Sequence, residues 1–154
     1  SYIDKNTIPS LKSTFELEMF NTFRSYKSFK ENRPSFLLNN IDERGSFSEL
    51  IRTEIGGQFS YSTTLPGFTR GNHFHTRKIE RFMVIVGEAK ICLRKTGTDQ
   101  VYEYYLNGDK PSFVDMPIWY THNITNIGSS PLITAFWINE PYNSEDADTY
   151  FENV

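Results

Sequence analysis

Short segments rich in β-branched and aromatic residues fill the chain from Ser35 onward, and a turn signal closes most of them. Strands are expected at 35–40, 46–54, 57–65, 80–86, 89–95, 101–106, 112–115, 119–125 and 131–139. Glycine-containing pairs separate several of them, and Asn107-Gly108 is typical of a type I′ hairpin turn. Many short strands at regular turn spacing favour an antiparallel sandwich or barrel over parallel βαβ units. The predicted fold class is therefore all-β.

One short amphipathic helix is expected before the strands, at about 14–26. Ser13 stands three residues before Glu16, which is the spacing of a capping box. An apolar stripe follows at a helical period: Phe15, Met19 and Phe23. We expect this stripe to pack against a neighbouring surface, because a helix in water needs an apolar face to dock.

Length, charge and cysteine content narrow the class of protein. A chain of 154 residues fits one domain, so we expect a linker and helix segment at 1–34 and the folded domain at 35–154. The net charge of −3 argues against nucleic-acid or anionic-membrane binding. One cysteine excludes an internal disulfide. No run of 18 apolar residues and no secretion signal is seen, so a cytoplasmic location is expected.

The three histidines of the chain carry the clearest indication of chemistry. His73 and His75 are two residues apart, which puts both imidazoles on one face of an extended strand. A turn after them could bring Glu80 onto the neighbouring strand, and His122 lies far downstream. Three neutral imidazoles and a carboxylate suit a first-row divalent metal and leave coordination positions open.

The spacing around these residues resembles the two consensus motifs of the cupin superfamily. The first motif reads Gly67-x5-His73-x-His75-x4-Glu80-x6-Gly87, and the second reads Pro117-x4-His122-x3-Asn126. The one departure is Trp119, which stands where the second motif usually has a glycine. The resemblance implies an RmlC-like cupin fold, an antiparallel β-sandwich or jelly-roll barrel. It also implies that His73, His75, Glu80 and His122 are metal ligands, with zinc as the expected ion.

A narrower resemblance covers most of residues 13–154. It is carried by the segments Asp42-Glu43-Arg44-Gly45-Ser46-Phe47-Ser48-Glu49, Gly57-Gln58-Phe59-Ser60, Pro66-Gly67-Phe68-Thr69-Arg70-Gly71-Asn72-His73, Tyr120-Thr121-His122-Asn123-Ile124, Trp137-Ile138-Asn139-Glu140 and Asp148-Thr149-Tyr150. These segments are similar to the C-terminal cupin domain of the CapF/WbjC-type bifunctional enzymes of capsular polysaccharide and O-antigen sugar synthesis.

That family implies an activity and a set of partners. Its cupin domain epimerises C3 of a UDP-2-acetamido-2,6-dideoxy-4-hexulose on the route to UDP-N-acetyl-L-fucosamine, and an N-terminal short-chain reductase then reduces C4 with NADPH. This chain has no Gly-x-Gly-x-x-Gly/Ala fingerprint, so no NAD(P) site is expected in it. We expect the epimerase domain, either excised or encoded alone, a UDP-sugar substrate, and a homodimer.

Candidate residues for proton transfer and substrate binding are less sharply defined by the sequence. Tyr61, Tyr120 and Lys78 are the side-chain candidates for moving the C3 proton, and a metal-bound water is another. Arg70 is the candidate for the diphosphate, because arginine matches phosphate geometry. Asn72 and Trp119 are the further candidates for substrate contact, and Arg44 and Arg52 are additional cations.

Three other functions stay open at this point. The same ligand set would serve iron or manganese in a dioxygenase or isomerase that acts on another small substrate. A non-enzymatic sugar-binding cupin would need no open coordination position. A metal-free epimerase would use a His–Asp base pair, and no clear aspartate partner stands in these motifs.

Overall fold

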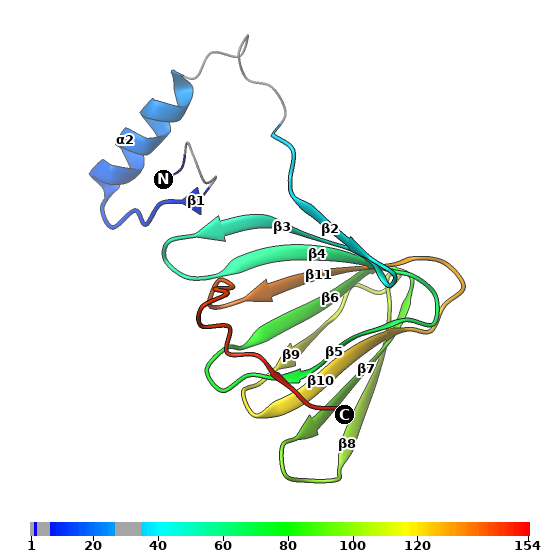
Figure 1. Cartoon of the computed structure of the whole chain (residues 1–154). Coiled ribbons are helices and arrows are strands. Elements are labelled where there is room, and N and C mark those ends of the chain that lie inside the picture. Colours follow the sequence, from blue (N-terminus) through cyan, green and yellow to red (C-terminus); the bar gives the residue numbers. More distant parts are fainter. Residues whose placement is uncertain (1, 3–6, 27–34) are drawn as a thin grey trace.

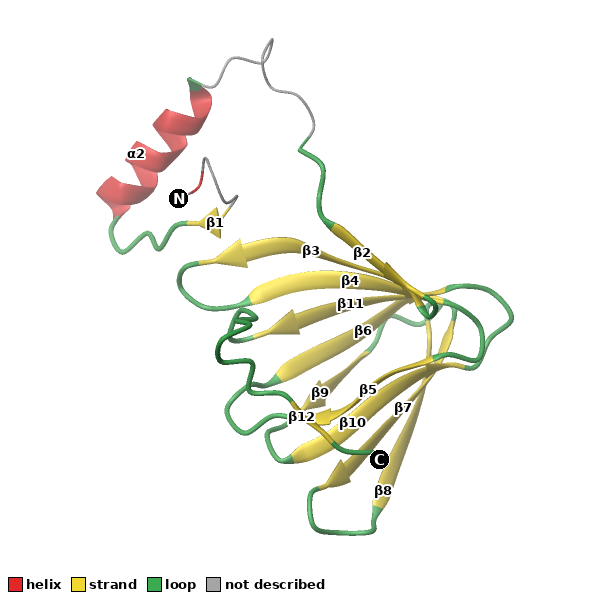
Figure 2. Cartoon of the chain, in the orientation of Figure 1, coloured by secondary structure: helices red, strands yellow, loops and turns green. Residues whose placement is uncertain are grey.

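Two β-sheets face each other in the computed structural model, which describes residue 2 and residues 7–26 and 35–154 (Figure 1). The seven-stranded sheet contains, in spatial order, β1 (Thr7–Ile8), β3 (Gly45–Thr53), β4 (Gln58–Thr64), β11 (Leu132–Ile138), β6 (Glu80–Val86) and β9 (Phe113–Met116), with β2 (Asn39–Asp42) paired to β3. The five-stranded sheet contains β12 (Tyr150–Phe151), β5 (Thr69–Phe74), β10 (Tyr120–Asn126), β7 (Glu88–Lys95) and β8 (Val101–Asn107). The predicted all-β sandwich is confirmed, and Figure 2 shows strands as its dominant element.

Successive strands pass from one sheet to the other, as from β5 to β6 and from β6 to β7. All neighbouring strands are antiparallel except β1 and β3, which run parallel. This topology brings segments that are distant in sequence into register. His122 in β10, for example, is the register partner of His73 in β5.

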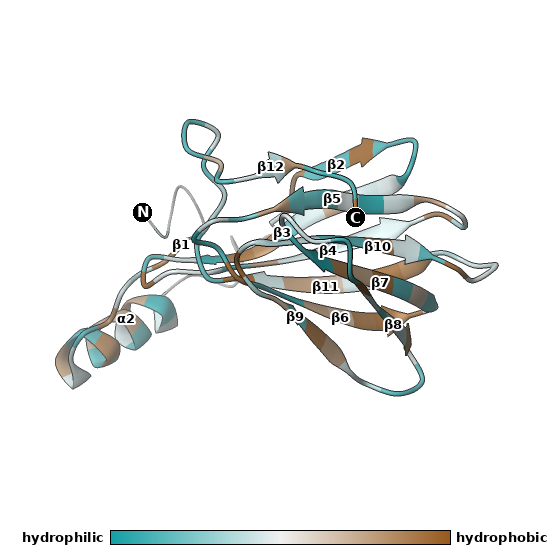
Figure 3. Cartoon of the chain, turned by 90° about the horizontal axis from the view of Figure 1, so that it is seen from below, coloured by the Kyte–Doolittle hydropathy of each residue, from teal (hydrophilic) through white to brown (hydrophobic). Residues whose placement is uncertain are grey.

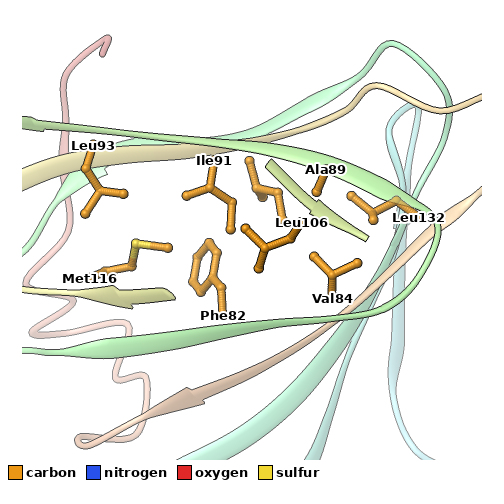
Figure 4. Packing of buried hydrophobic residues seen from close by; sticks show 9 residues of the cluster. Phe82, Val84, Ala89, Ile91, Leu93, Leu106, Met116 and Leu132 are labelled. Carbon is orange, nitrogen blue, oxygen red and sulfur yellow. The ribbon is translucent and has the colours of Figure 1, made fainter. Parts of the chain in front are cut away.

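Apolar side chains from both sheets form one buried cluster between them (Figure 4). Its members are Phe82, Val84, Ala89, Ile91, Leu93, Leu106, Met116, Ile124 and Leu132. In β7 the period-2 pattern turns Ile91 and Leu93 inward. Figure 3 shows the same contrast in colour, with apolar residues along β6 and polar residues along β5.

The interior beside β4 is polar instead. The buried residues of this strand are Gln58, Ser60, Ser62 and Thr64, whereas the alternate residues Phe59 and Tyr61 are only partly buried. The hydrophobic cluster therefore occupies only part of the space between the sheets, and the cavity beside it has a mixed lining in which Gln58 and Ser60 supply polar groups.

Helix α2 (Thr14–Ser25) begins with the predicted capping box: Ser13 Oγ accepts from the Glu16 N–H, and the Glu16 carboxylate accepts from the Ser13 N–H. The stripe of α2 finds no cover among the described residues, where no residue of the helix is buried and Phe15 is 69 % exposed, so its packing against a neighbouring surface stays a prediction. The ring that does pack is Phe20, whose centroid lies 5.1 Å from that of Tyr2. The part of the chain that the structure describes contains no helix long and apolar enough to cross a membrane.

The predicted hairpin at Asn107-Gly108 is also wrong. β8 ends at Asn107 and pairs with β7, whereas β9 begins at Phe113 and pairs with β6 in the other sheet. The connection therefore crosses between sheets, and the Gly108 N–H donates to the Gly87 carbonyl at 3.0 Å. Neither central residue of the expected turn has the positive φ that a type I′ turn requires.

The sequence missed strand β5, although this strand carries Arg70 and His73. Polar residues and Gly71 interrupt the alternation there, and the structure places an irregularity at this point. The register with β10 shifts between His122 and Asn123, and both Gly71 and Asn72 have positive φ. This β-bulge explains why the segment lacks the regular signature of a strand.

Candidate metal centre

The three histidines and Glu80 come from opposite sheets and meet between them. His73 and His122 lie on the neighbouring strands β5 and β10, and His75 directly follows β5. Glu80 is the first residue of β6, which belongs to the other sheet. The sequence predicted Glu80 on an adjacent strand, whereas the carboxylate in fact approaches the imidazoles from across the interior.

Gly71 allows β5 and β10 to approach closely beside the histidines. A Cβ added to Gly71 would lie 2.7 Å from the carbonyl oxygen of His122 and 3.0 Å from the Cα of Asn123. Its φ of +95° is in addition unfavourable for any residue with a side chain. The bulge at this glycine leaves both Arg70 and His73 in the lining of the interior cavity.

The four side chains converge on one point. Their ligand atoms all lie within 4.8 Å of one another. Nε2 of His122 is 3.0 Å from Oε2 of Glu80, and Nε2 of His75 is 3.5 Å from the same oxygen. The ring centroids of His73 and His122 are 4.7 Å apart. All four residues that the cupin motifs predicted as ligands are thus in one group.

Backbone carbonyls orient two of the imidazoles. Nδ1 of His75 lies 2.5 Å from the carbonyl oxygen of Asp148, and Nδ1 of His122 lies 3.1 Å from that of Tyr120. A carbonyl oxygen can only accept, so each Nδ1 must carry the proton. The unprotonated Nε2 atoms then face Glu80, as in metal sites where the second ring nitrogen is held by an outer partner.

The electrostatics of the group favour a neutral His73 and an ionised Glu80. Burial and the neighbouring His122 lower the pKa of His73 to about 4. Burial opposes ionisation of Glu80, but the neighbouring imidazoles of His122 and His75 hold the pKa of this carboxyl well below its usual range. Burial also opposes protonation of His75, but Glu80 outweighs it and raises the pKa of this imidazole. Glu80 is therefore an anion that attracts a cation to this point.

The residues present fit a divalent metal ion. His75 is 4 % exposed, and among the described residues its Nε2 has no hydrogen-bond partner, although the atom points at the centre of the group. An orphaned buried nitrogen is costly unless a ligand satisfies it. Three imidazoles and one carboxylate match the donor preferences of zinc and of other first-row ions.

The loop between His75 and Glu80 is held by the C-terminal segment. The carboxylate of Asp148 accepts from the N–H groups of Thr76, Arg77 and Lys78, at 3.1, 3.0 and 3.1 Å, and from the Thr76 hydroxyl at 2.6 Å. Burial alone would raise the pKa of Asp148, but these donors lower it to about 2. The carboxylate is thus committed to the loop, and only the carbonyl of Asp148 faces an imidazole.

A cavity of about 850 Å³ extends from the metal group toward β3 and β4. His73, His75 and Glu80 are part of its lining. Charged residues elsewhere in the described lining are Arg44, Arg52, Arg70, Lys78 and Glu49. Cations therefore outnumber carboxylates in the cavity, although the whole chain carries a net charge of −3. This charge distribution favours an anionic ligand.

Arg70 and Lys78 are the two predicted site residues that line the cavity beside the metal group. Nε of Arg70 donates to Thr64 Oγ1 at 3.0 Å, which holds the guanidinium at the cavity wall. The Lys78 side chain is 1 % exposed, and its Nζ donates to the carbonyl of Ala147 at 2.7 Å. Arg44 and Arg52 lie further out, in ion pairs with Asp42 and Glu49.

The two predicted tyrosines lie elsewhere. Tyr61 is on the face of β4 opposite Ser60, a residue of the cavity lining, and it is not part of that lining as described. Tyr120 packs against the hydrophobic cluster and contributes its carbonyl, not its hydroxyl, to the orientation of His122. Neither tyrosine is therefore part of the described cavity lining that contains Lys78.

Asn72 and Trp119 also lie outside the described cavity lining. Oδ1 of Asn72 accepts from Nδ2 of Asn123 at 2.9 Å across the bulge. The Trp119 ring stacks on Phe74 with centroids 5.8 Å apart, and Phe74 stacks on Tyr150. Trp119 has a φ of +62°, so the tryptophan keeps the left-handed turn for which a glycine is usual. Both residues support the strands around the site.

Sequence reasoning missed several residues of the site. The polar lining of β4, Gln58 and Ser60, was not singled out, and neither was the clamp formed by Asp148. Only the resemblance in Asp148-Thr149-Tyr150 pointed to the C-terminal segment, and it carried no role. No local pattern connects Asp148 with His75, because 73 residues separate them.

Comparisons with known proteins agree with this geometry. CapF from Staphylococcus aureus, a capsular polysaccharide assembling protein, is 42 % identical with a TM-score of 0.88, over 96 % of this chain and 40 % of that chain. A UDP-2-acetamido-2,6-beta-L-arabino-hexul-4-ose reductase from Pseudomonas aeruginosa is 42 % identical over 109 residues, which are 71 % of this chain and 29 % of that protein. The chain thus spans less than half the length of either relative.

A shorter relative is the spore coat polysaccharide biosynthesis protein SpsL of Bacillus subtilis, 26 % identical over 122 residues, with 73 % of this chain and 81 % of that protein covered. The polysaccharide biosynthesis C-terminal domain family matches residues 40–150, which include the metal group and Asp148. The close superposition on CapF confirms the predicted cupin fold. On these grounds, the chain belongs to the polysaccharide biosynthesis C-terminal domain family, as a cupin domain of the CapF type.

Proposed function

We propose that this domain catalyses the metal-dependent epimerisation at C3 of a UDP-2-acetamido-2,6-dideoxy-4-hexulose. The observation that carries the proposal is the position of the His73, His75, Glu80 and His122 group at one end of a cavity lined by cations. The reductase relative is named for a UDP-hexul-4-ose of this type, which supports the choice of substrate.

Binding of the nucleotide sugar follows from the charge and size of the cavity. A volume of about 850 Å³ falls in the range of small-molecule sites, about 300–1,000 Å³. We assign the diphosphate to Arg70, whose side chain is 13 % exposed and held in place by Thr64. Desolvation strengthens the attraction between a guanidinium and a phosphate.

The reaction needs a stabilised enolate and groups that move one proton. A divalent ion held by the four ligands would polarise the C4 carbonyl as a Lewis acid, with zinc as the expected ion. We assign proton transfer on one face of the sugar to Lys78, because its buried amine shares the cavity with His75 and Glu80. Hydride transfer is not required, since epimerisation beside a ketone leaves the oxidation state unchanged.

The direct test is hydrogen exchange at C3. The metal-loaded domain, without NADPH, is incubated in deuterated buffer with the UDP-4-hexulose, and the mass of the sugar nucleotide is followed. A gain of about one mass unit is expected, because enolisation labilises the proton next to the carbonyl. If the domain binds the sugar nucleotide and leaves C3 unlabelled, a binding module replaces the epimerase.

Three variants separate the roles of the side chains. Lys78→Met should slow exchange by about 10²–10⁴-fold, the usual contribution of a general acid or base. Tyr61→Phe is the matched control, since Tyr61 lies on the face of β4 away from the cavity, and it should exchange like the parent. Arg70→Gln should mainly raise KM, because a diphosphate contact is equal in the ground and transition states.

We further propose the wider setting that the sequence predicts. The reduction of C4 would belong to a separate reductase domain, in the cytoplasm, and the product would serve capsule or O-antigen synthesis as UDP-N-acetyl-L-fucosamine. The assembly we propose is a homodimer. Transfer of label from C3 to a reduced product, when an NADPH-dependent reductase is added, would test the order of the two steps.

A further inference from the structure

Asp148 contacts His75 and the loop that leads from His75 to Glu80 through different atoms. Its carboxylate binds the backbone of Thr76, Arg77 and Lys78, the loop that leads from His75 to Glu80. Its carbonyl oxygen lies 2.5 Å from Nδ1 of His75. One residue therefore sets both the shape of the loop and the tautomer of an imidazole.

The backbone of Asp148 is adapted to this double contact. Its φ is +44°, a left-handed conformation that aspartate and asparagine tolerate better than most residues. The residue is 5 % exposed, so burial of its carboxylate carries a desolvation cost, and the hydrogen bonds from the loop N–H groups offset that cost.

The segment that follows Asp148 fixes it to the histidine strand. Tyr150 and Phe151 form β12, which pairs with β5, so that Phe151 is the register partner of His73. The Tyr150 ring stacks on Phe74 with centroids 5.3 Å apart. Glu152 then accepts from the Thr121 hydroxyl and forms an ion pair with Arg94 at 3.1 Å. The C-terminal segment is thus anchored on either side of the ligands.

We propose that Asp148 is a positioning residue for the metal centre: it preorganises Nε2 of His75 and the carboxylate of Glu80 for the ion. The inference rests on the metal site of the proposed function. Outer-sphere partners of this kind typically change metal affinity by about 10–100-fold when they are removed.

The test compares Asp148→Asn with Asp146→Asn. Asparagine keeps the main-chain carbonyl and tolerates the left-handed backbone, but it loses the charge and an acceptor oxygen. Asp146 lies in the same segment, is exposed, and pairs with Arg77 without contacting any ligand, so it is the matched control. Zinc affinity is measured by chelator competition, and the ligand field is measured from the visible spectrum of the cobalt-substituted protein.

Asp148→Asn is expected to weaken zinc binding by about 10–100-fold and to shift the cobalt spectrum, while Asp146→Asn leaves both unchanged. A variant that unfolds more easily but keeps the parent's affinity and spectrum would show a purely structural role and overturn the inference. A parent protein that binds no metal would overturn the metal site itself, and the inference with it.

A second measurement covers the case in which Asp148→Asn does not fold. Nitrogen-15 NMR of the metal-free parent reports which ring nitrogen of His75 carries the proton. The Nδ1–H tautomer is expected, since the Asp148 carbonyl can only accept. Thr76→Val, which removes only the hydroxyl donor, should reduce zinc affinity in the same direction and by a smaller factor. An Nε2–H tautomer, or unchanged affinity in Thr76→Val, contradicts the proposal.

Discussion

Gly71→Ala should destabilise the domain far more than the same change at Gly67. Both glycines have positive φ, +95° at Gly71 and +79° at Gly67, so both substitutions place a side chain in an unfavourable backbone conformation. The two sites differ in the room available for a side chain. A Cβ at Gly67 would have no neighbouring atom within 4 Å, whereas a Cβ at Gly71 would lie 2.7 Å from the His122 carbonyl oxygen. The pair therefore separates the conformational cost from the steric cost.

The expected magnitudes follow from these two contributions. The left-handed conformation costs alanine about 1–2 kcal/mol, which is the whole expected loss for Gly67→Ala. Forcing a methyl group against backbone adds about 1–3 kcal/mol at Gly71. The total for Gly71→Ala is then about 2–5 kcal/mol. In a domain of this size the steric part alone corresponds to a difference of about 2–12 °C in Tm.

Urea unfolding of both variants, followed by tryptophan fluorescence, measures the two free energies. Zinc affinity is measured in parallel, because relief of the clash must move the backbone of His122, a proposed ligand. Gly71→Ala should lose affinity and Gly67→Ala should keep it. Equal destabilisation by the two variants would refute the close approach of β5 and β10 that the structure shows.

Three further predictions concern the metal, acid stability and assembly. Protein purified without chelators should contain about one divalent ion per chain, and His122→Ala should abolish the rise in Tm that zinc gives to the parent, since no ligand then closes the shell. The folded state lowers the pKa of Asp148 from 3.8 to about 2, so the ionised carboxylate adds about 2 kcal/mol to the free energy of unfolding above about pH 4. This contribution is lost as the pH falls toward 2. Asp148→Asn should therefore make stability less dependent on pH between about pH 4 and pH 2. The exposed stripe of Phe15, Met19 and Phe23 supports a homodimer, and light scattering that gives a monomer at high micromolar concentration would contradict it.

The sequence predicted those features that depend on short-range patterns, namely the alternation of residues along a strand and the spacing of residues within a motif. Ile91 and Leu93 alternate with Lys90, Cys92 and Arg94, and the structure turns both inward. The spacing from His73 to Glu80 places both residues in the same group as the distant His122, since β5 and β10 are neighbours. The fold and the ligand set follow from such regular features.

Strand β4 shows why other predictions failed. Alternation defines two faces but does not say which one is inside, and aromatic residues usually mark the inner face. Here Ser60 and Ser62 are buried, whereas Tyr61 is on the other face, because β4 turns its small polar side chains toward the interior and Ser60 lines the cavity. A tyrosine was therefore chosen as a site residue in place of the serines beside it.

Distance along the chain explains the remaining misses. Asp148 reaches the His75 loop only through the pairing of β12 with β5, and strands of two residues have no recognisable pattern. The stripe on α2 has a helical period, but a period cannot identify a docking partner, and Phe15, Met19 and Phe23 are exposed in the part of the chain that the structure describes.

The origin of the ligands in two different sheets has a mechanical consequence. Among the described residues, hydrophobic packing joins the sheets through the cluster around Phe82, and the metal group borders this cluster, with the Phe82 ring 5.6 Å from that of His122. An ion shared by Glu80 and the histidines would act there as a cross-link between the layers. Without the ion, the two sheets would separate locally more often beside the metal group, and with the ion they would separate less often. Amide hydrogen exchange in β5, β6 and β10 should therefore slow as metal occupancy rises.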